Sequence, residues 1–316
     1  MPVNDNIRVV EYNTIQTRIS RILGATSGGT PDFGYGQTVQ SSQVTTADRV
    51  TVNEWGNLRF DIINVYTHQV GSAPNTVVLP DIAEGGTIRY SVTDAPINVW
   101  DILSSTLETN RFNLSGLQAI TTNIGPYNLN ASWINQATWE GRMLFSNSTN
   151  ATHFFNSGGK ITFNSTFSPS NTVSPKAQET SWQNLLASVG DVTWGGATPE
   201  TGTSPDNAKN FHKLTSSYQA FYSVSASSPY GANNYNIDAR TEGGNLSDLR
   251  FRIRYVDSYT DPALAEPVYA PADGVSGNLL INIVLTIPSQ TLQPPALSQT
   301  WQVQTPIISQ LAFSAS

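Results

Sequence analysis

The chain contains no cysteine among its 316 residues, and only 12% of its side chains are charged. The absence of cysteine excludes disulfide bonds, thiolate metal sites and cysteine nucleophiles together. Lys and Arg number only 16, and the formal net charge is −7. A protein whose main task is to grip a nucleic-acid backbone needs a basic surface, so we expect no nucleic-acid partner.

Long apolar runs are also missing from the sequence. No run approaches the roughly 20 residues that span a bilayer, so we expect no membrane partner. The first residues, Met1–Asn6, lack the basic and apolar stretches of a secretory signal. A disordered chain is excluded as well, because 7 Trp, 12 Tyr and 12 Phe supply ample material for a core.

The second half of the chain has the pattern of a β protein. Asn, Ser and Thr, which favour turns and strand surfaces, are enriched over the whole chain, and Gly, Pro and Asn mark the turns in this half. Apolar and polar residues alternate most clearly in Leu249–Tyr255, where one face is apolar and the other carries three arginines. A short helix over 180–189 ends at Gly190. We predict a β-sandwich over 141–316 with this helix inserted, its strands lying at 160–167, 191–194, 217–225, 233–240, 249–257 and 278–287.

The first 75 residues instead show helical spacing. Apolar residues recur every three or four positions within 9–23, and again after Thr51-Val52-Asn53-Glu54, which fits a capping box. Gly24 and Gly71 stand where the two helices end. The apolar stripes consist of Tyr12, Ile15, Ile19 and Ile22 in the first helix and of Trp55, Leu58, Ile62 and Tyr66 in the second.

These two helices predict an N-terminal helical hairpin over 1–75. Neither helix can bury its stripe alone, so each needs the other or a partner chain. We therefore predict that the eight stripe residues form an assembly interface. Residues 76–140 form a mixed middle region, with short strands expected at 76–79 and 87–92 and helical spacing over 98–112. The fold class predicted for the whole chain is mainly β, or α+β overall.

Motifs that carry chemistry are scarce. His68, His153 and His212 lie far apart, without the converging ligands that zinc requires. Asp257 and Asp261 could be a glycosidase pair or bind calcium weakly, but an acidic turn is the favoured interpretation. Nucleophile-elbow, P-loop and dinucleotide motifs are all missing from the sequence. We therefore predict no catalytic residue, no cofactor and no metal.

Aromatic residues leave one binding alternative open. Tyr222, Tyr230 and Tyr235 could stack on the apolar faces of a sugar, while neighbouring Asn residues bind its hydroxyl groups. Aromatic residues in strands are more often core or cross-strand pairs. These three tyrosines are thus the candidate contacts for a host surface glycan, with burial in the core as the competing interpretation.

The sequence resembles virion structural proteins of tailed phages, especially cyanophages. The segment His153–Phe163, HFFNSGGKITF, is the part most similar to these proteins. Further similar segments follow in the same order, so the resemblance covers most of the chain outside about 76–130. They are Gly34–Gln37, Trp55–Leu58, His68–Gly71, Thr180–Leu186, Asn210–Gln219, Ser228–Tyr235 and Leu249–Asp257.

The resemblance implies a multimeric particle component without enzyme activity. Its expected partners are copies of itself and other virion proteins, and its expected location is the virion, assembled in the host cytoplasm. We expect a neck or tail accessory subunit, collar-like or fibre-like, that docks through its N-terminal helices. The alternatives are a capsid decoration protein and an adhesin that binds host glycan. Phe154 and Phe155 are expected to be buried anchors, followed by a turn at 156–159.

Overall fold

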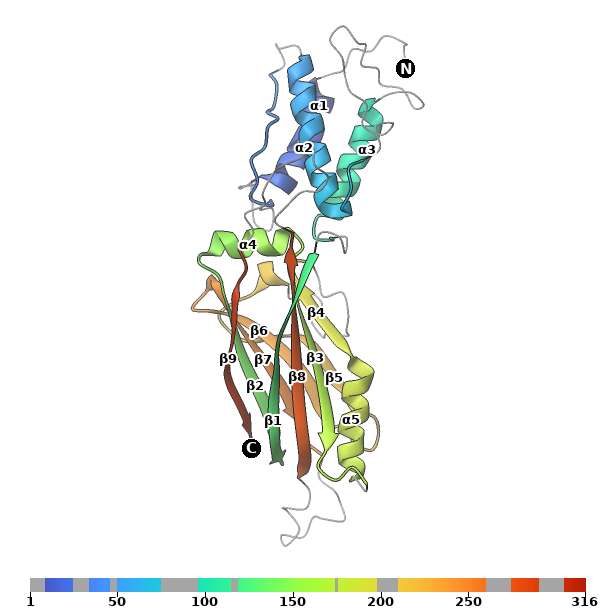
Figure 1. The fold of residues 1–316 in the computed structure, drawn as a ribbon, viewed down its shortest axis with the longest axis vertical. Coiled ribbons are helices and arrows are strands. Elements are labelled where there is room, and N and C mark those ends of the chain that lie inside the picture. The colour runs from blue at the N-terminus through green and yellow to red at the C-terminus, as the bar shows by residue number, and fades with distance from the viewer. Residues whose placement is uncertain are drawn as a thin grey trace. The chain divides into compact units, whose positions relative to one another are not determined.

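The chain folds into two compact units. The first, which we call the helical unit, comprises residues 1–120, 152–158 and 287–303, and the second, the sandwich unit, comprises residues 121–151, 159–286 and 304–316. Within them, the computed structural model describes residues 9–24, 34–45, 50–74, 96–114, 119–173, 176–197, 210–259, 274–289 and 304–316 (Figure 1).

This division corrects the predicted domains. Residues 76–140 are not a middle region of their own, because the boundary between the units falls inside them, at residue 120. The strands expected at 76–79 and 87–92 lie outside the described residues. In the described parts of the chain, no helix is both long and apolar enough to cross a bilayer.

Three helices form the body of the helical unit as far as its residues are described. They are α1 (Val9–Leu23), α2 (Val52–Val70) and α3 (Pro96–Thr109). Trp55 of α2 joins them, since its ring lies 5.1 Å from Tyr12 of α1 and 5.2 Å from Trp100 of α3. The predicted hairpin is therefore incomplete, because a third helix covers the first two.

The ends of α2 are set by local sequence, as predicted. Thr51 accepts a hydrogen bond from the Glu54 amide, and the Glu54 carboxylate accepts one from the Thr51 amide, which completes the capping box. Gly71 ends the helix with a left-handed φ of 83°, a conformation that costs glycine little. The predicted bounds of α1 are also confirmed.

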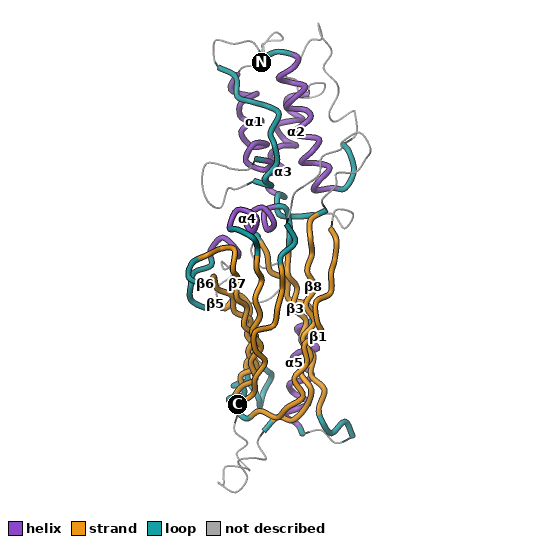
Figure 2. The backbone as a smooth tube through the Cα atoms, turned by 60° about the vertical axis from the view of Figure 1, so that its left-hand side comes forward, coloured by secondary structure: helices purple, strands orange, loops and turns teal. Residues whose placement is uncertain are grey.

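The sandwich unit is built from two antiparallel sheets (Figures 1 and 2). The fold class predicted from sequence is confirmed. The four-stranded sheet has the order β1 (Ala119–Trp133), β8 (Val275–Pro288), β3 (Lys160–Pro169) and β4 (Asp191–Gly195). The five-stranded sheet has the order β5 (Gln219–Ser225), β6 (Asn234–Glu242), β7 (Asn245–Val256), β2 (Gln136–Leu144) and β9 (Ile307–Ala315).

Aromatic rings fill the space between the sheets. Phe163 of β3 lies 5.2 Å from Phe251 of β7 and 6.4 Å from Trp139 of β2, measured between ring centroids. Trp194 of β4 approaches the same Phe251 ring at 5.3 Å. Side chains in a strand alternate between faces, and β3, β7 and β2 each place buried residues at every second position facing this layer.

In the described residues, two helices and one short turn accompany the strands. Helix α4 (Ser148–Asn156) ends in the turn that leads into β3, and its Phe154 and Phe155 are fully buried, as predicted. Helix α5 (Ala177–Val189) is the predicted inserted helix and packs against β3. A single 3₁₀ turn, η2 (Phe211–Lys213), precedes β5.

Candidate functional site

Three of the segments that carry the phage-protein resemblance meet inside the helical unit. They are Gly34–Gln37, the end of α2 around His68, and residues 153–158 from α4 and its following turn. The first segment is fixed by the end of α1, because Tyr35 donates its amide hydrogen to the Ile22 carbonyl at 2.7 Å. We call this meeting point the Tyr35 cluster and define it as Tyr35, His68, Gln69, His153 and Asn156.

Tyr35 is the centre of this cluster. Its side chain is 1% exposed, and its hydroxyl donates to the Arg111 carbonyl at 2.5 Å. The same hydroxyl accepts a hydrogen bond from Gln69 Nε2 at 2.8 Å. Burial raises the pKa of Tyr35 well above its ordinary value, so the phenol stays protonated. Both its donor and its acceptor capacity thus serve to join chain segments.

His68 lies beside Tyr35, with 4.7 Å between the ring centroids. Its Nε2 is 3.0 Å from the Ser157 carbonyl oxygen, which can only accept, so Nε2 carries the proton of the neutral ring. Burial lowers the pKa of His68 to about 4, against a smaller opposing effect of the bond to Ser157. A fully buried, neutral imidazole that bonds a backbone carbonyl is a structural group rather than a general base.

Close packing completes the cluster. Gly36 has a φ of 74°, and a side-chain carbon at this position would collide with the His153 ring, so only glycine fits. Asn156 donates to the Gly34 carbonyl at 3.5 Å, which is a long hydrogen bond. His68 and His153 share this unit, yet the described residues contain no group of three His, Asp or Glu side chains that could hold a metal ion.

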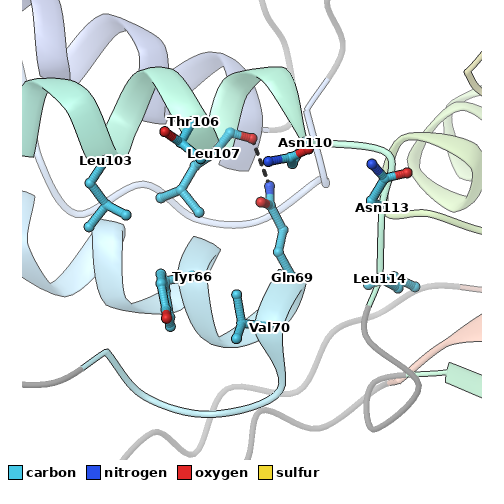
Figure 3. Close-up of a pocket in the computed structure, with 9 residues that line it drawn as sticks. All are labelled: Tyr66, Gln69, Val70, Leu103, Thr106, Leu107, Asn110, Asn113 and Leu114. Atoms are coloured by element: carbon cyan, nitrogen blue, oxygen red, sulfur yellow. Dashed lines mark hydrogen bonds between the residues drawn. The ribbon is translucent and has the colours of Figure 1, made fainter.

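A cavity of about 310 Å³ adjoins the cluster between α2 and α3 (Figure 3). Its walls combine aliphatic side chains with the amides of Gln69, Asn110 and Asn113, and Gln69 is bonded to the Leu107 carbonyl at 2.9 Å. The lining carries no carboxylate, imidazole or amine. The volume is at the lower limit of ordinary ligand pockets, and the Tyr66 phenol is the one titratable group among the described residues of the lining.

The predicted assembly interface, formed by the residues of the apolar stripes in the first two helices, is not confirmed. Seven of them face the core of the helical unit and are at most 1% exposed, namely Tyr12, Ile15, Ile19, Ile22, Trp55, Leu58 and Ile62. Tyr66 alone is partly exposed, and it lines the cavity. The prediction was wrong because α3, which was assigned to another region, covers the stripes from within the same chain.

The prediction of glycan contacts is also wrong for two of the three tyrosines. Tyr235 is fully buried and Tyr222 is 6% exposed, so neither can stack on a sugar. Tyr235 and Tyr255 instead bond Ser165 of the facing sheet at 3.0 and 2.8 Å. Tyr230 is partly exposed, and its ring lies 4.6 Å from that of Tyr259. The competing interpretation, burial in the core, holds for Tyr222 and Tyr235.

The structure describes only one member of the acidic pair Asp257 and Asp261, and that residue has a structural role. Asp257 is buried and accepts two hydrogen bonds from Gln178 Nε2, at 2.7 and 2.8 Å. This bond ties α5 to the end of β7. Asp261 lies outside the described residues. His212, in η2, is partly exposed and belongs to the sandwich unit, whereas His68 and His153 belong to the helical unit.

Charged residues gather on the outer face of the five-stranded sheet. The register places Arg240, Arg250 and Arg142 directly opposite one another on β6, β7 and β2. Asp248 lies between two of them, 2.7 Å from Arg142 and 3.2 Å from Arg250. Burial raises the pKa of Asp248, but the hydrogen bond from Arg142 and the nearby positive charges outweigh this and lower it overall. The predicted arginine face of β7 is confirmed, and its charges are paired.

Sequence reasoning missed the roles of Tyr35 and Asp61. Asp61 of α2 is fully buried and accepts hydrogen bonds from the Gln40 amide at 3.0 Å and from the Ser41 amide and hydroxyl at 2.7 Å. The sequence did contain a signal for the burial of Asp61, because this acidic residue directly precedes Ile62 and lies on the apolar side of the predicted helix. A carboxylate there needs donors from another segment.

Fold and contacts together define a two-unit protein, a helical unit with a buried polar cluster and an antiparallel β-sandwich. Comparison of the chain with protein-family models, with curated proteins and with solved structures gives no match.

Proposed function

We propose that the protein is a non-enzymatic structural component of a tailed-phage particle, present in several copies. The main observation that supports this proposal is the Tyr35 cluster. The segments with the strongest resemblance to phage virion proteins lie far apart in sequence, yet they converge on one buried network. Its hydrogen bonds join chain segments to one another, which is the arrangement of a fold-defining motif rather than of a reaction centre.

Within the particle, a neck or tail accessory subunit remains our preferred position, and capsid decoration is the alternative. The predicted docking through the N-terminal helices needs revision, because their apolar stripes are buried. The helical unit can still dock on another virion protein through outward residues such as Ile102 of α3, which is 59% exposed. The adhesin alternative is not retained, since two of its three candidate tyrosines lie in the core.

The experiment is to purify the phage particles and measure the copy number of the protein by quantitative mass spectrometry, then locate it by electron cryomicroscopy. We expect a fixed copy number that matches the symmetry of one particle region, neck, tail or capsid. The protein's absence from washed particles would overturn the proposal.

A variant pair then tests docking through the helical unit. Ile102→Lys should reduce incorporation, because a charge would be buried at the contact. Val173→Lys, a substitution at a residue that is 91% exposed in the sandwich unit, is the matched control. Equal incorporation of the two variants would show that the α3 face is not used.

A further inference from the structure

The apolar layer between the two sheets is covered at one edge of the sandwich and exposed at the other. On one side, β4 pairs with β3 only over Lys160–Asn164, and α5 lies against β3 beyond it. Trp182 of α5 reaches the facing sheet, where its ring lies 6.2 Å from that of Tyr255. Helix α5 therefore closes this side of the apolar layer.

The other side is bordered by β1 and β9, the outermost strands of their sheets. Tyr127 of β1 lies 5.4 Å from Trp139 of β2, and Trp139 is paired in register with Phe313 of β9. Both edges therefore belong to the same side, which Figure 1 shows away from α5. Only at the end of β1 does a ring reach that helix, since Trp133 lies 6.3 Å from Trp182. Among the described residues, β1 pairs with β8 alone and β9 with β2 alone.

These two strands are far more exposed than the strands between them. No residue of β9 is buried, and Ile307 and Leu311 are 68% and 46% exposed. Most described side chains of β1 are exposed too, Trp133 being its buried exception. By contrast, β8 buries every second residue along its length. We call the exposed side formed by β1 and β9 the open edge.

The open edge carries no ionic charge. Neither β1 nor β9 contains Asp, Glu, Lys, Arg or His, although the whole chain has a formal charge of −7. Natural edge strands usually prevent pairing with other chains by charged side chains, proline or bulges. In this protein, the features that hinder such pairing are Pro126 in β1 and a shift in the register between β9 and β2 at Leu311. They limit where another strand can pair, but no charge repels one.

We propose that the open edge is the contact between copies of this chain. A second copy is the occupant that fits, because strands without charged side chains can meet the same strands of another copy without like-charge repulsion. The inference deepens the proposed function, since it assigns the surface through which the copies meet.

The size of the open edge suits a stable contact. Strand β1 has 15 residues, which corresponds to about 50 Å at a rise of about 3.3 Å per residue. Two sheets about 10 Å apart, with their side chains, present an edge roughly 15–20 Å wide. Strand β9 has only 9 residues, about 30 Å, so the mean length of the edge is about 40 Å. The resulting area of roughly 600–800 Å² per copy is close to that of a standard specific interface.

The test measures self-association of the full-length chain by sedimentation velocity over a range of concentrations. Two variants place charges on the open edge, Ile307→Lys with Leu311→Lys on β9, and Asn128→Lys with Asn130→Lys on β1. All four side chains are exposed, so the fold should tolerate lysine. We expect the wild type to form oligomers and each double variant to raise the dissociation constant by at least about tenfold.

Matched controls carry the same charges elsewhere in the sandwich unit. They are Val173→Lys and the pair Gln183→Lys with Asn184→Lys on the exposed face of α5, on the closed side. These controls should associate like the wild type. A wild type that stays monomeric, or edge variants that associate as tightly as the controls, would overturn the inference.

The lack of cysteine in the chain permits a second measurement. A single Asn130→Cys variant should be linked into dimers by a short bis-maleimide reagent, whereas Gln183→Cys should not. Particle measurements separate the two proposals. Edge-dependent association of a protein that is absent from particles would refute the proposed function alone, and incorporation of edge variants at the wild-type copy number would refute the inference alone.

Discussion

The helical unit and the sandwich unit fill their cores with different chemistry. The helical unit buries Asp61, His68 and Gln69 among its apolar residues, and these polar groups bind loops and helix ends. The sandwich unit buries stacked and edge-on aromatic rings between two sheets. The irregular segments beside the three helices have to be covered, and the backbone of such segments needs hydrogen-bond partners. Irregular chain thus adds buried polar groups to a helical core that also contains the Tyr12, Trp55 and Trp100 rings, whereas aromatic rings dominate the layer between the regular strands.

The largest effect should come from the ring at the centre of the sandwich. Phe163→Ala removes a fully buried ring that contacts Trp139, Phe221 and Phe251, and should lower the free energy of unfolding by about 4 kcal/mol. Urea unfolding measures the loss, and hydrogen exchange shows where protection falls. Phe163→Leu, which leaves a smaller cavity, is the control. A loss below about 1 kcal/mol would contradict the assigned core.

In the helical unit the largest effect should come from Asp61. Asp61→Ala leaves the Gln40 and Ser41 amides and the Ser41 hydroxyl without their acceptor, at a cost of about 3 kcal/mol. Hydrogen exchange should increase in the segment 37–45 before it increases elsewhere. Asp61→Asn keeps the shape and one acceptor oxygen, so it should lose less. Equal stability of the wild type and Asp61→Ala would show that this carboxylate does not hold the segment.

Acid should destabilise the helical unit through His68. Its pKa in the folded chain is about 4, below the ordinary 6.5, so the unfolded chain binds the proton more tightly. Stability is therefore complete above about pH 6.5 and is lost as the pH falls towards 4, by about 2 kcal/mol at pH 5. Unfolding in urea at pH 7 and pH 5 measures this loss. His68→Gln, which retains a donor for the Ser157 carbonyl, should remove that part of the pH dependence, and an unchanged dependence would contradict the assignment.

The smallest effect should come from the arginine face of the sandwich. Arg142→Gln breaks the ion pair with Asp248, whose side chain is 11% exposed, while that of Arg142 is 34% exposed. Solvent screens such a pair, so we expect a loss of about 1 kcal/mol that shrinks in high salt. Urea unfolding at two salt concentrations is the measurement. A loss as large as that of Phe163→Ala would mean that charge pairing, rather than ring packing, dominates this unit.

Local signals in the sequence were sufficient for most of the elements. The capping box at Thr51 and Glu54 and the glycine at 71 define the ends of α2 because each acts within one or two turns. The alternation in Leu249–Tyr255 predicts β7 because successive side chains in a strand point to opposite faces. Both signals depend only on near neighbours, so a single sequence carries them.

The candidate site was much less accessible to prediction. Tyr35, His68 and Ser157 are distant in sequence, and no spacing rule relates them. The two buried tyrosines of β5 and β6, Tyr222 and Tyr235, were predicted as surface contacts although they lie in the core. An aromatic residue in a strand can serve the core or the surface, and only the facing Ser165, contributed by β3, places Tyr235 inside.

The sequence by itself determined the α+β class, the caps of α2 and most of the helices and strands, because propensity and periodicity act over a few residues. It did not predict β1, β2, β9 or α4. Only the tertiary structure decided what covers each apolar stripe. Trp100 of α3 covers Trp55, and α5 closes one side of the sandwich while leaving β1 and β9 exposed on the other. The physical reason is that burial is non-directional and stabilises any contact between apolar surfaces. Which surfaces meet depends on the path of the whole chain.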